Sequence, residues 1–129
     1  MGEWSETQVA GHPVEVYRPA EANPHGYVLI YLHGVHLGKL HDKRPCREAF
    51  ERFGLPVVCP VTQRSWRTNR ICAEFSTEIT AMQHVMRNVL PWIETEFNAA
   101  PPKLGLFGTS MGGQGALRLS YLHPDVFPV

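Results

Sequence analysis

The sequence predicts an α/β protein in which helices cover both faces of a mostly parallel sheet. Three observations lead to this prediction. Short apolar runs bounded by turn residues alternate with longer segments of helical periodicity along the 129 residues. A glycine-flanked serine, Ser110, stands directly between one such run and a helical segment. The apolar fraction of 43% and the charged fraction of 19% are typical of a globular domain rather than of a disordered chain.

The first half of the chain contains three predicted strands or strand-like runs and one helix. Residues 1–13 carry little signal, and alternation over residues 12–19 indicates a half-exposed strand. The continuous apolar runs at 27–32 and 55–60 are typical of parallel strands that are buried on both faces. Between these two runs, residues 42–54 have an apolar stripe, an early proline and a final glycine, which together predict a helix.

The second half is predicted to add a long helix, a strand and a final helix. Residues 76–97 carry one apolar stripe, and Pro91 within them predicts a kink rather than two helices. Residues 103–107 indicate a short strand. The helix that follows Ser110 should end near Leu122, because Pro124 disfavours helical geometry in the residue before it. The stripe consists of Ile79, Met82, Val85, Met86, Val89, Leu90, Ile93 and Phe97.

The turn around Ser110, which we call the elbow, spans residues 108–112 and has the spacing G-x-S-x-G. A sharp strand-to-helix turn leaves little room for Cβ atoms two residues before and after its apex, and glycine has none. Such a turn lifts a serine hydroxyl clear of the sheet, as a nucleophile requires. The alternatives are a serine that only caps the helix and a purely structural glycine turn. A P-loop would need lysine at Gln114, and a dinucleotide fingerprint would need a small residue at Arg118.

The His33 loop, residues 33–38, follows the buried run 27–32. Ligands of open parallel sheets bind at such carboxyl ends of strands. The nearby histidines raise the question of a metal site, but their spacing does not match H-E-x-x-H, and no acidic residue separates His33 from His36. We therefore expect no metal, and we expect His36 to line the mouth of a pocket. His41 is the third histidine of this group.

The polar loop 61–70 is predicted to lie on the same ligand-binding side of the sheet. One interpretation is that its cationic or indole side chains, Trp66 and Arg67 above all, contact an acidic or polar acyl substrate. The other is a solvated basic loop, since Arg64 and Arg70 are also present.

Two separated motifs in this order resemble the first half of an α/β-hydrolase, in particular the group that contains esterase D and S-formylglutathione hydrolase. His33-Gly34 after a buried strand is similar to the oxyanion loop of that group. Gly108-Thr109-Ser110-Met111-Gly112 is similar to its nucleophile elbow, with Gly108 and Gly112 as the elbow glycines. The resemblance covers nearly all of residues 14–129.

The resemblance implies roles for these residues. Ser110 would be the nucleophile of a serine esterase, and the backbone N–H groups of Met111 and Val35 would form its oxyanion hole. His33 and Gly34 would support the oxyanion loop rather than supply a base. The implied substrate is a short acyl ester, a thioester or a carbohydrate-linked ester, and no cofactor is implied.

The residues after Ser110 do not complete the family's triad, whose order is serine, acid, histidine. His123 and Asp125 follow, but a helix would place His123 roughly 20 Å from Ser110, whereas a general base must lie within about 3 Å of the proton that it removes. We therefore expect residues 1–129 to be one incomplete α/β-hydrolase domain that stops after the elbow helix and is inactive as a fragment. A non-catalytic binding or interaction protein with this fold is the alternative.

Charge and composition disfavour several other classes of protein. Twelve basic residues balance twelve acidic ones, so no net field attracts nucleic acid or an anionic membrane. No apolar run reaches the roughly 20 residues of a membrane helix, and the first residues lack the pattern of a signal peptide. The odd, sparse cysteines Cys46, Cys59 and Cys72 indicate inert thiols and a cytoplasmic location. The oligomeric state stays open.

Overall fold

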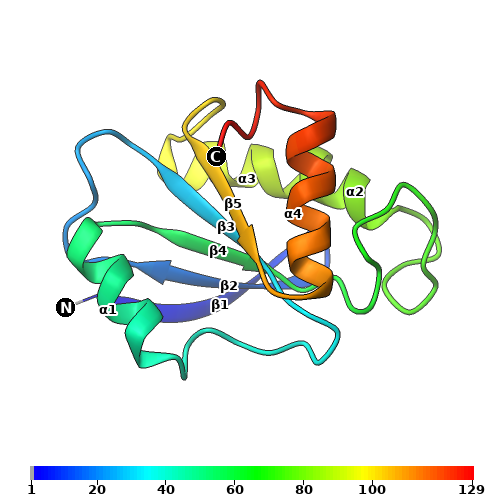
Figure 1. The fold of residues 1–129 in the computed structure, drawn as a ribbon, viewed down its shortest axis with the longest axis horizontal. Helices are drawn as coiled ribbons and strands as arrows, with labels where there is room; N and C mark the ends of the chain where they lie inside the picture. Colours follow the sequence, from blue (N-terminus) through cyan, green and yellow to red (C-terminus); the bar gives the residue numbers. More distant parts are fainter. Residues whose placement is uncertain (1) are drawn as a thin grey trace.

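The structure is a computed structural model that describes residues 2–129 (Figure 1). A sheet with helices against both of its faces forms the body of the molecule. The elements in chain order are β1 (Glu3–Val9), β2 (His12–Arg18), β3 (Val28–Leu32), α1 (Arg44–Phe53), β4 (Val57–Pro60), α2 (Ala81–His84), the π-helix η1 (Val85–Val89), α3 (Leu90–Phe97), β5 (Leu104–Gly108) and α4 (Met111–Leu122).

The sheet is parallel in its centre and antiparallel along one edge. Its strand order is β1-β2-β4-β3-β5. β3 is parallel to both β4 and β5, which confirms the predicted core of parallel strands. β2 is antiparallel to both of its neighbours, β1 and β4. The predicted α/β class is therefore confirmed, with a mixed rather than a uniformly parallel sheet.

β1 lies within residues 1–11, where the sequence predicts no strand. It pairs with β2 over its whole length, from Glu3 opposite Arg18 to Val9 opposite His12. Ala10 and Gly11 join the two strands with φ angles of 50° and 81°, a pair of positive values that suits a tight hairpin. Most side chains of β1 are at least partly exposed, so the apolar alternation that identifies a half-buried strand is absent.

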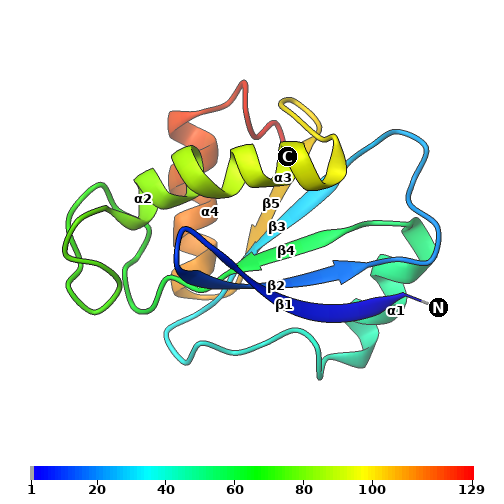
Figure 2. The same cartoon turned by 180° about the vertical axis from the view of Figure 1, so that it is seen from behind.

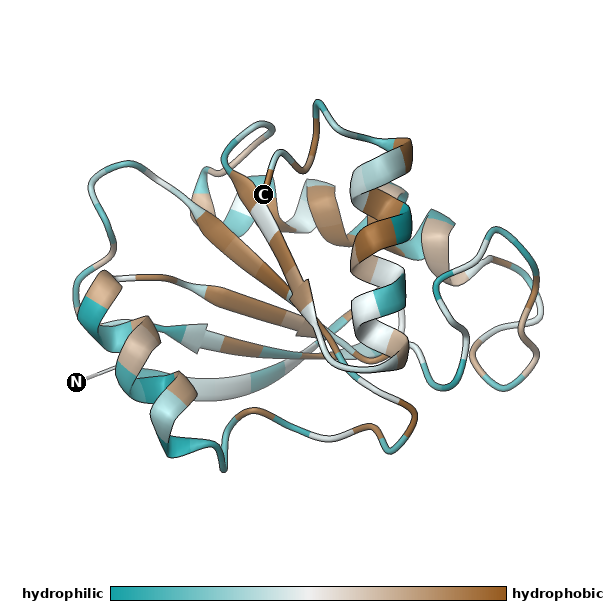
Figure 3. Cartoon of the chain, in the orientation of Figure 1, coloured by the Kyte–Doolittle hydropathy of each residue, from teal (hydrophilic) through white to brown (hydrophobic). Residues whose placement is uncertain are grey.

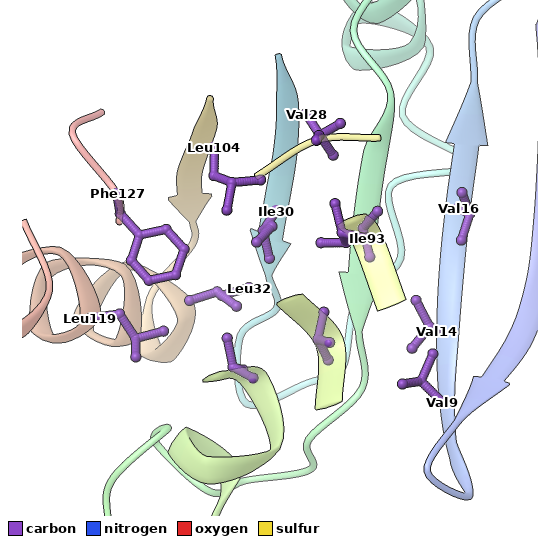
Figure 4. Close-up of a cluster of buried hydrophobic side chains, with 14 residues drawn as sticks. Val9, Val14, Val16, Val28, Ile30, Leu32, Ile93, Leu104, Leu119 and Phe127 are labelled. Carbon is purple, nitrogen blue, oxygen red and sulfur yellow. The ribbon is translucent and has the colours of Figure 1, made fainter. Parts of the chain in front are cut away.

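The two faces of the sheet carry separate apolar clusters, because successive residues of a strand point to opposite faces. Ile30 and Leu32 of β3 face the cluster formed with η1, α3 and α4, and Figure 4 shows Leu119 and Phe127 beside them. Tyr31 belongs to the opposite cluster, which includes residues of α1. Figure 2 shows α3 crossing in front of β5 and β3, with α2 in front of α4. Figure 3 shows that the central strands are among the most apolar segments.

The long predicted helix begins later than expected. Its first residue is Ala81, not Ser76, because Thr80 and Gln83 form a capping box at this point. The Thr80 hydroxyl accepts a hydrogen bond from the Gln83 N–H (3.1 Å), and the Gln83 side chain accepts one from the Thr80 N–H (3.0 Å). This reciprocal pair satisfies two donors that a helix start otherwise leaves free.

The irregularity expected at Pro91 takes the form of a π-helical segment. η1 ends two residues before Pro91, and the Leu90 N–H donates to the Val85 carbonyl, five residues earlier. Proline lacks an N–H and crowds the carbonyl four residues before it, and a wider turn relieves that crowding. The predicted apolar stripe is confirmed at its centre, where Val85, Val89 and Ile93 are fully buried.

α1 agrees closely with its prediction and ends at Gly54, whose φ of 62° is the left-handed conformation of a helix stop. The Glu51 carboxylate of α1 accepts hydrogen bonds from the N–H groups of Gly2 (2.7 Å) and Ala20 (3.0 Å) and from the Tyr17 hydroxyl (3.0 Å). These contacts lower the pKa of Glu51, the Ala20 N–H most of all. They tie α1 to both ends of the chain segment that contains the β1–β2 hairpin.

α4 ends at Leu122, as predicted, and its outer face carries exposed apolar side chains. Leu117 and Tyr121 are 73% and 86% exposed and line a groove with residues near the C-terminal end of the chain. Beside this groove, the Leu106 N–H of the edge strand β5 donates to the Val129 carbonyl (2.9 Å). Within the described residues, no helix has the length and apolar character needed to cross a bilayer.

Candidate active site around Ser110

The elbow and the His33 loop lie at the same edge of the sheet. β3 and β5 are parallel neighbours with Leu32 opposite Gly108, so the two loops leave the sheet side by side. A Cβ atom placed on Gly34 would lie 3.6 Å from the Ser110 Cβ and 3.3 Å from the Thr109 carbonyl oxygen. The fold thus brings together two motifs that are far apart in the sequence.

Ser110 occupies a strained backbone conformation at the apex of the elbow. Its φ of 52° and ψ of −115° fall outside the regions that L-residues ordinarily adopt. Glycine is required on both sides of it. A Cβ on Gly112 would overlap the Leu32 carbonyl oxygen, and one on Gly108 would overlap the backbone of Gly112. The Ser110 residue itself is exposed.

Two backbone N–H groups, one after Ser110 in the elbow and one in the His33 loop, lack acceptors among the described residues. Met111 is the first residue of α4, where N–H groups lack intrahelical partners. The Gly112 N–H donates to the Thr109 carbonyl (2.8 Å), whereas within residues 2–129 no acceptor is found for the N–H of Met111 or of Val35. Two free donors, one from each loop, are the components of which an oxyanion hole is made.

His33 is buried, and hydrogen bonds hold it at three positions. Its Nε2 accepts from the Thr62 N–H (3.0 Å), and its Nδ1 lies 2.8 Å from the Gly34 carbonyl oxygen. Its own carbonyl oxygen accepts from Arg67 Nη1 (2.8 Å). Burial lowers the pKa of His33 to about 4, so the ring is neutral at pH 7 and donates from Nδ1 to Gly34. With both ring nitrogens engaged, His33 is suited to fix the loop and not to accept a proton.

Acid should destabilise the fold through His33 and a second buried histidine, His84, whose pKa burial also lowers to about 4. An unfolded histidine titrates near 6.5, so the unfolded state binds protons first as the pH falls. The contribution of the two neutral histidines to the free energy of unfolding is fully present above about pH 6.5. It should fall by roughly 3 kcal/mol per histidine by pH 4. Urea midpoints of the full-length protein between pH 7.5 and 4 measure this loss. In a His84→Gln variant, a pH dependence as steep as in the unaltered protein would contradict this assignment for His84.

The other predicted site residues differ in their exposure to solvent. His36 is exposed, and Trp66 is 42% exposed, so both are accessible to a ligand. Arg67 is a correction to the sequence analysis. Its side chain is neither exposed to a substrate nor solvated, because it is fully buried and donates to the His33 carbonyl oxygen. In contrast, Arg64 forms an exposed ion pair with Glu74 (2.8 Å).

Residues that the sequence analysis did not single out also support the site. The Tyr31 hydroxyl lies 2.9 Å from Thr109 Oγ1 and links β3 to the elbow. Thr62 holds the His33 ring through its backbone N–H, for which no side-chain pattern gives a signal. Tyr31 could have been found from its position, since it is the penultimate residue of the strand before the His33 loop.

No histidine or carboxylate among residues 2–129 is hydrogen-bonded to the Ser110 side chain. The Ser110 hydroxyl has no hydrogen-bond partner among residues 2–129, and His123 directly follows the last residue of α4. The 12 residues of α4 span about 18 Å, so His123 lies far from the elbow.

No group of three or more metal-ligating side chains gathers anywhere in residues 2–129. Cys46, Cys59 and Cys72 are free thiols, and burial raises the pKa of Cys59, which disfavours its reactive thiolate form.

A comparison with protein-family models identifies the family of this chain. The model described as "Putative esterase" matches residues 11–129. The chain belongs to this esterase family. A comparison with curated proteins found no match.

Solved structures similar to this esterase-family chain have an α/β-hydrolase fold. An S-formylglutathione hydrolase from Agrobacterium tumefaciens gives a TM-score of 0.73 at 20% identity, over 98% of this chain and 54% of that one. The fluorophosphonate-binding serine hydrolase F of Staphylococcus aureus gives 0.71 at 16% identity, over 98% and 53%. A ferulic acid esterase gives 0.72 at 16% identity, over 98% and 55%. The chain spans about half the length of these structures.

Proposed function

We propose that this chain carries the nucleophile and oxyanion elements of a serine carboxylic-ester hydrolase. One observation carries the proposal. Ser110 stands exposed on a strained turn between β5 and α4, with Gly34 of the His33 loop packed against its Cβ. A structural glycine turn needs no exposed serine in such a conformation, and a capping serine would hydrogen-bond to its helix, which the Ser110 side chain does not do.

The proposed reaction proceeds through an acyl-enzyme. The Ser110 hydroxyl attacks the ester carbonyl, and the N–H groups of Met111 and Val35 stabilise the tetrahedral oxyanion. A histidine oriented by a carboxylate takes the serine proton and returns it to the leaving alcohol or thiol. Water then releases the acid by the reverse sequence. Both of these groups would come from outside residues 2–129, because the Ser110 side chain is not hydrogen-bonded to any residue within them.

The proposed substrate is a small ester or thioester, and the chemistry needs no cofactor. The structural neighbours include an S-formylglutathione hydrolase and a ferulic acid esterase, which by name act on a thioester and on an aromatic ester. In this chain, His36 of the His33 loop and Trp66 of the loop after β4 are exposed, a polar and an aromatic group. They would contact the acyl or alcohol part at the mouth of the site.

A non-catalytic binding protein is the second candidate, and it is favoured by the missing proton acceptor near Ser110. Labelling of the full-length protein with a fluorophosphonate, followed by peptide mass spectrometry, separates the two functions. The reagent reacts with an activated serine, so the esterase should be modified at Ser110. Absence of modification, or modification at another residue, would support the binding protein and refute the hydrolase.

Residues 1–129 alone should hydrolyse a p-nitrophenyl ester at a rate near background. The oxyanion donors can remain in place, but without a base the serine hydroxyl is a weak nucleophile. Serine-dependent turnover of the 129-residue chain at ordinary enzymatic rates would show that it contains its own base.

A further inference from the structure

Arg67 carries a buried charge without a carboxylate partner in the described part of the chain. It is the largest of the fully buried side chains. Nη1 donates to the His33 carbonyl oxygen (2.8 Å), whereas Nε and Nη2 have no hydrogen-bond partner. Burial lowers the pKa of the guanidinium to about 10, which still leaves it charged at pH 7. An unpaired buried charge is costly to a fold, and this one contacts the first residue of the His33 loop.

The loop that carries Arg67 is bent so that the side chain turns inward. Gln63, Trp66 and Arg67 have φ angles of 51°, 56° and 49°, in the left-handed region that side chains disfavour. The Arg67 N–H donates to the Ser65 hydroxyl (3.3 Å), which stabilises this bend. Through Thr62 the same loop also holds the His33 ring. Residues of this loop therefore hydrogen-bond to both the ring and the carbonyl oxygen of His33.

The beginning of α4 packs against the other side of Arg67. A Cβ atom on Gly115 would lie 3.0 Å from Arg67 Cδ, so the arginine stem is in close contact with the helix. A Cβ on Gly112 would lie 2.7 Å from the His33 carbonyl oxygen, the atom to which Arg67 donates. Arg67 therefore lies between the His33 loop and the helix that starts at Ser110.

We propose that Arg67 is a positioning residue that holds the His33 carbonyl and thereby keeps the Gly34–Val35 backbone beside Ser110. The inference rests on the proposed function. Arg67 acts through the loop, because its buried guanidinium has no access to a substrate. Its contribution should appear in the transition state, when the Val35 N–H must meet a developing oxyanion, rather than in ground-state binding.

Ester hydrolysis by the full-length Arg67→Met variant tests this role. With p-nitrophenyl acetate, kcat should fall by about 10- to 100-fold while KM changes less than about threefold, since a small displacement of a donor mainly affects the transition state. Arg67→Lys should recover part of the loss, because an ammonium group can still donate to one carbonyl. Arg64→Met removes the same charge from the same loop at an exposed ion pair and should leave kcat unchanged. Unaltered kcat in Arg67→Met, with hydrolysis still dependent on Ser110, would overturn the proposal.

Titration of the His33 ring by NMR gives a readout that does not depend on hydrolysis. The Arg67 charge lowers the pKa of His33, so Arg67→Met should raise it and Arg64→Met should not. If Ser110 proves unreactive, the proposed function fails, and an unchanged His33 pKa in Arg67→Met would still separately refute the contact.

A second variant covers the case in which Arg67→Met does not fold. In Gly115→Ala the new methyl group would crowd Arg67 Cδ and displace the side chain without removing its charge. This variant should also lower kcat. Gly113→Ala is the matched control, since its Cβ would meet the Gly108 carbonyl oxygen at an ordinary 3.6 Å. Wild-type kcat in both glycine variants would overturn the proposal.

Discussion

Replacing Ser110 with glycine is expected to abolish fluorophosphonate labelling and, at the same time, to stabilise the fold. The hydroxyl that would react is lost. The backbone conformation at φ 52° and ψ −115° is strained for a residue with a Cβ but is open to glycine. Relief of that strain, less the greater entropy of glycine in the unfolded chain, should raise the free energy of unfolding by about 1 kcal/mol. Urea unfolding and probe labelling of the full-length protein measure the two effects.

Ser110→Ala is the matched control for this experiment. It removes the same hydroxyl but keeps the Cβ, so labelling should be lost without a gain in stability. Equal stability of the glycine and alanine variants would show that the backbone at this position is not strained. Labelling that persists in either variant would remove Ser110 from the role of nucleophile.

Gly112→Ala should have the largest effect on stability of any single methyl addition in the elbow. The new Cβ would overlap the carbonyl oxygen of Leu32, a backbone atom fixed by the β3–β5 pairing. The start of α4 must then move away from β3, and we expect a loss of at least about 3 kcal/mol in the free energy of unfolding. Because the same movement displaces the Met111 N–H, any folded protein should react poorly with the probe.

Gly113→Ala isolates the steric cause of this loss. The substitution is chemically identical, lies one residue along the same helix and would make only an ordinary contact at 3.6 Å. It should be neutral or stabilising by up to about 1 kcal/mol, since alanine favours helix over glycine. Similar urea midpoints for the two variants would show that the predicted overlap at Gly112 is relieved at little cost.

The central elements of the fold were predictable because burial leaves a strong pattern. β3, β4 and β5 are short apolar runs between turn residues, and α1 has both its early proline and its terminal glycine. β1 was not predictable in this way, because a largely exposed hairpin strand needs no apolar alternation. The start of the long helix was missed although Thr80 and Gln83 have the spacing of a capping box. Ser76 is an equally good capping residue by composition, so composition alone could not decide between them.

The turn around Ser110 was predictable because steric crowding demands both of its flanking glycines, Gly108 and Gly112, and any such turn shares that crowding. The position of Arg67 was not. A charged residue in a polar loop ordinarily faces water, and its burial depends on left-handed backbone angles and on a carbonyl oxygen supplied by a distant loop. Nothing local in residues 61–70 encodes that partner. The distance between Ser110 and His123 could be predicted from the sequence, because the length of α4 fixes it.

Five of the non-glycine residues with positive φ lie in the three loops that follow the parallel strands. They are Leu37, Gln63, Trp66, Arg67 and Ser110. Each of these residues adopts a strained backbone conformation whose free-energy cost the rest of the fold must offset. Glycine would adopt the same conformation with less strain. A selection for heat resistance alone would therefore draw its first gains from this edge of the molecule. Variants selected for stability at high temperature would be expected to keep a well-folded sheet and to lose the reactivity of Ser110. The natural protein would unfold at a lower temperature than these variants, because its functional loops retain strained backbone.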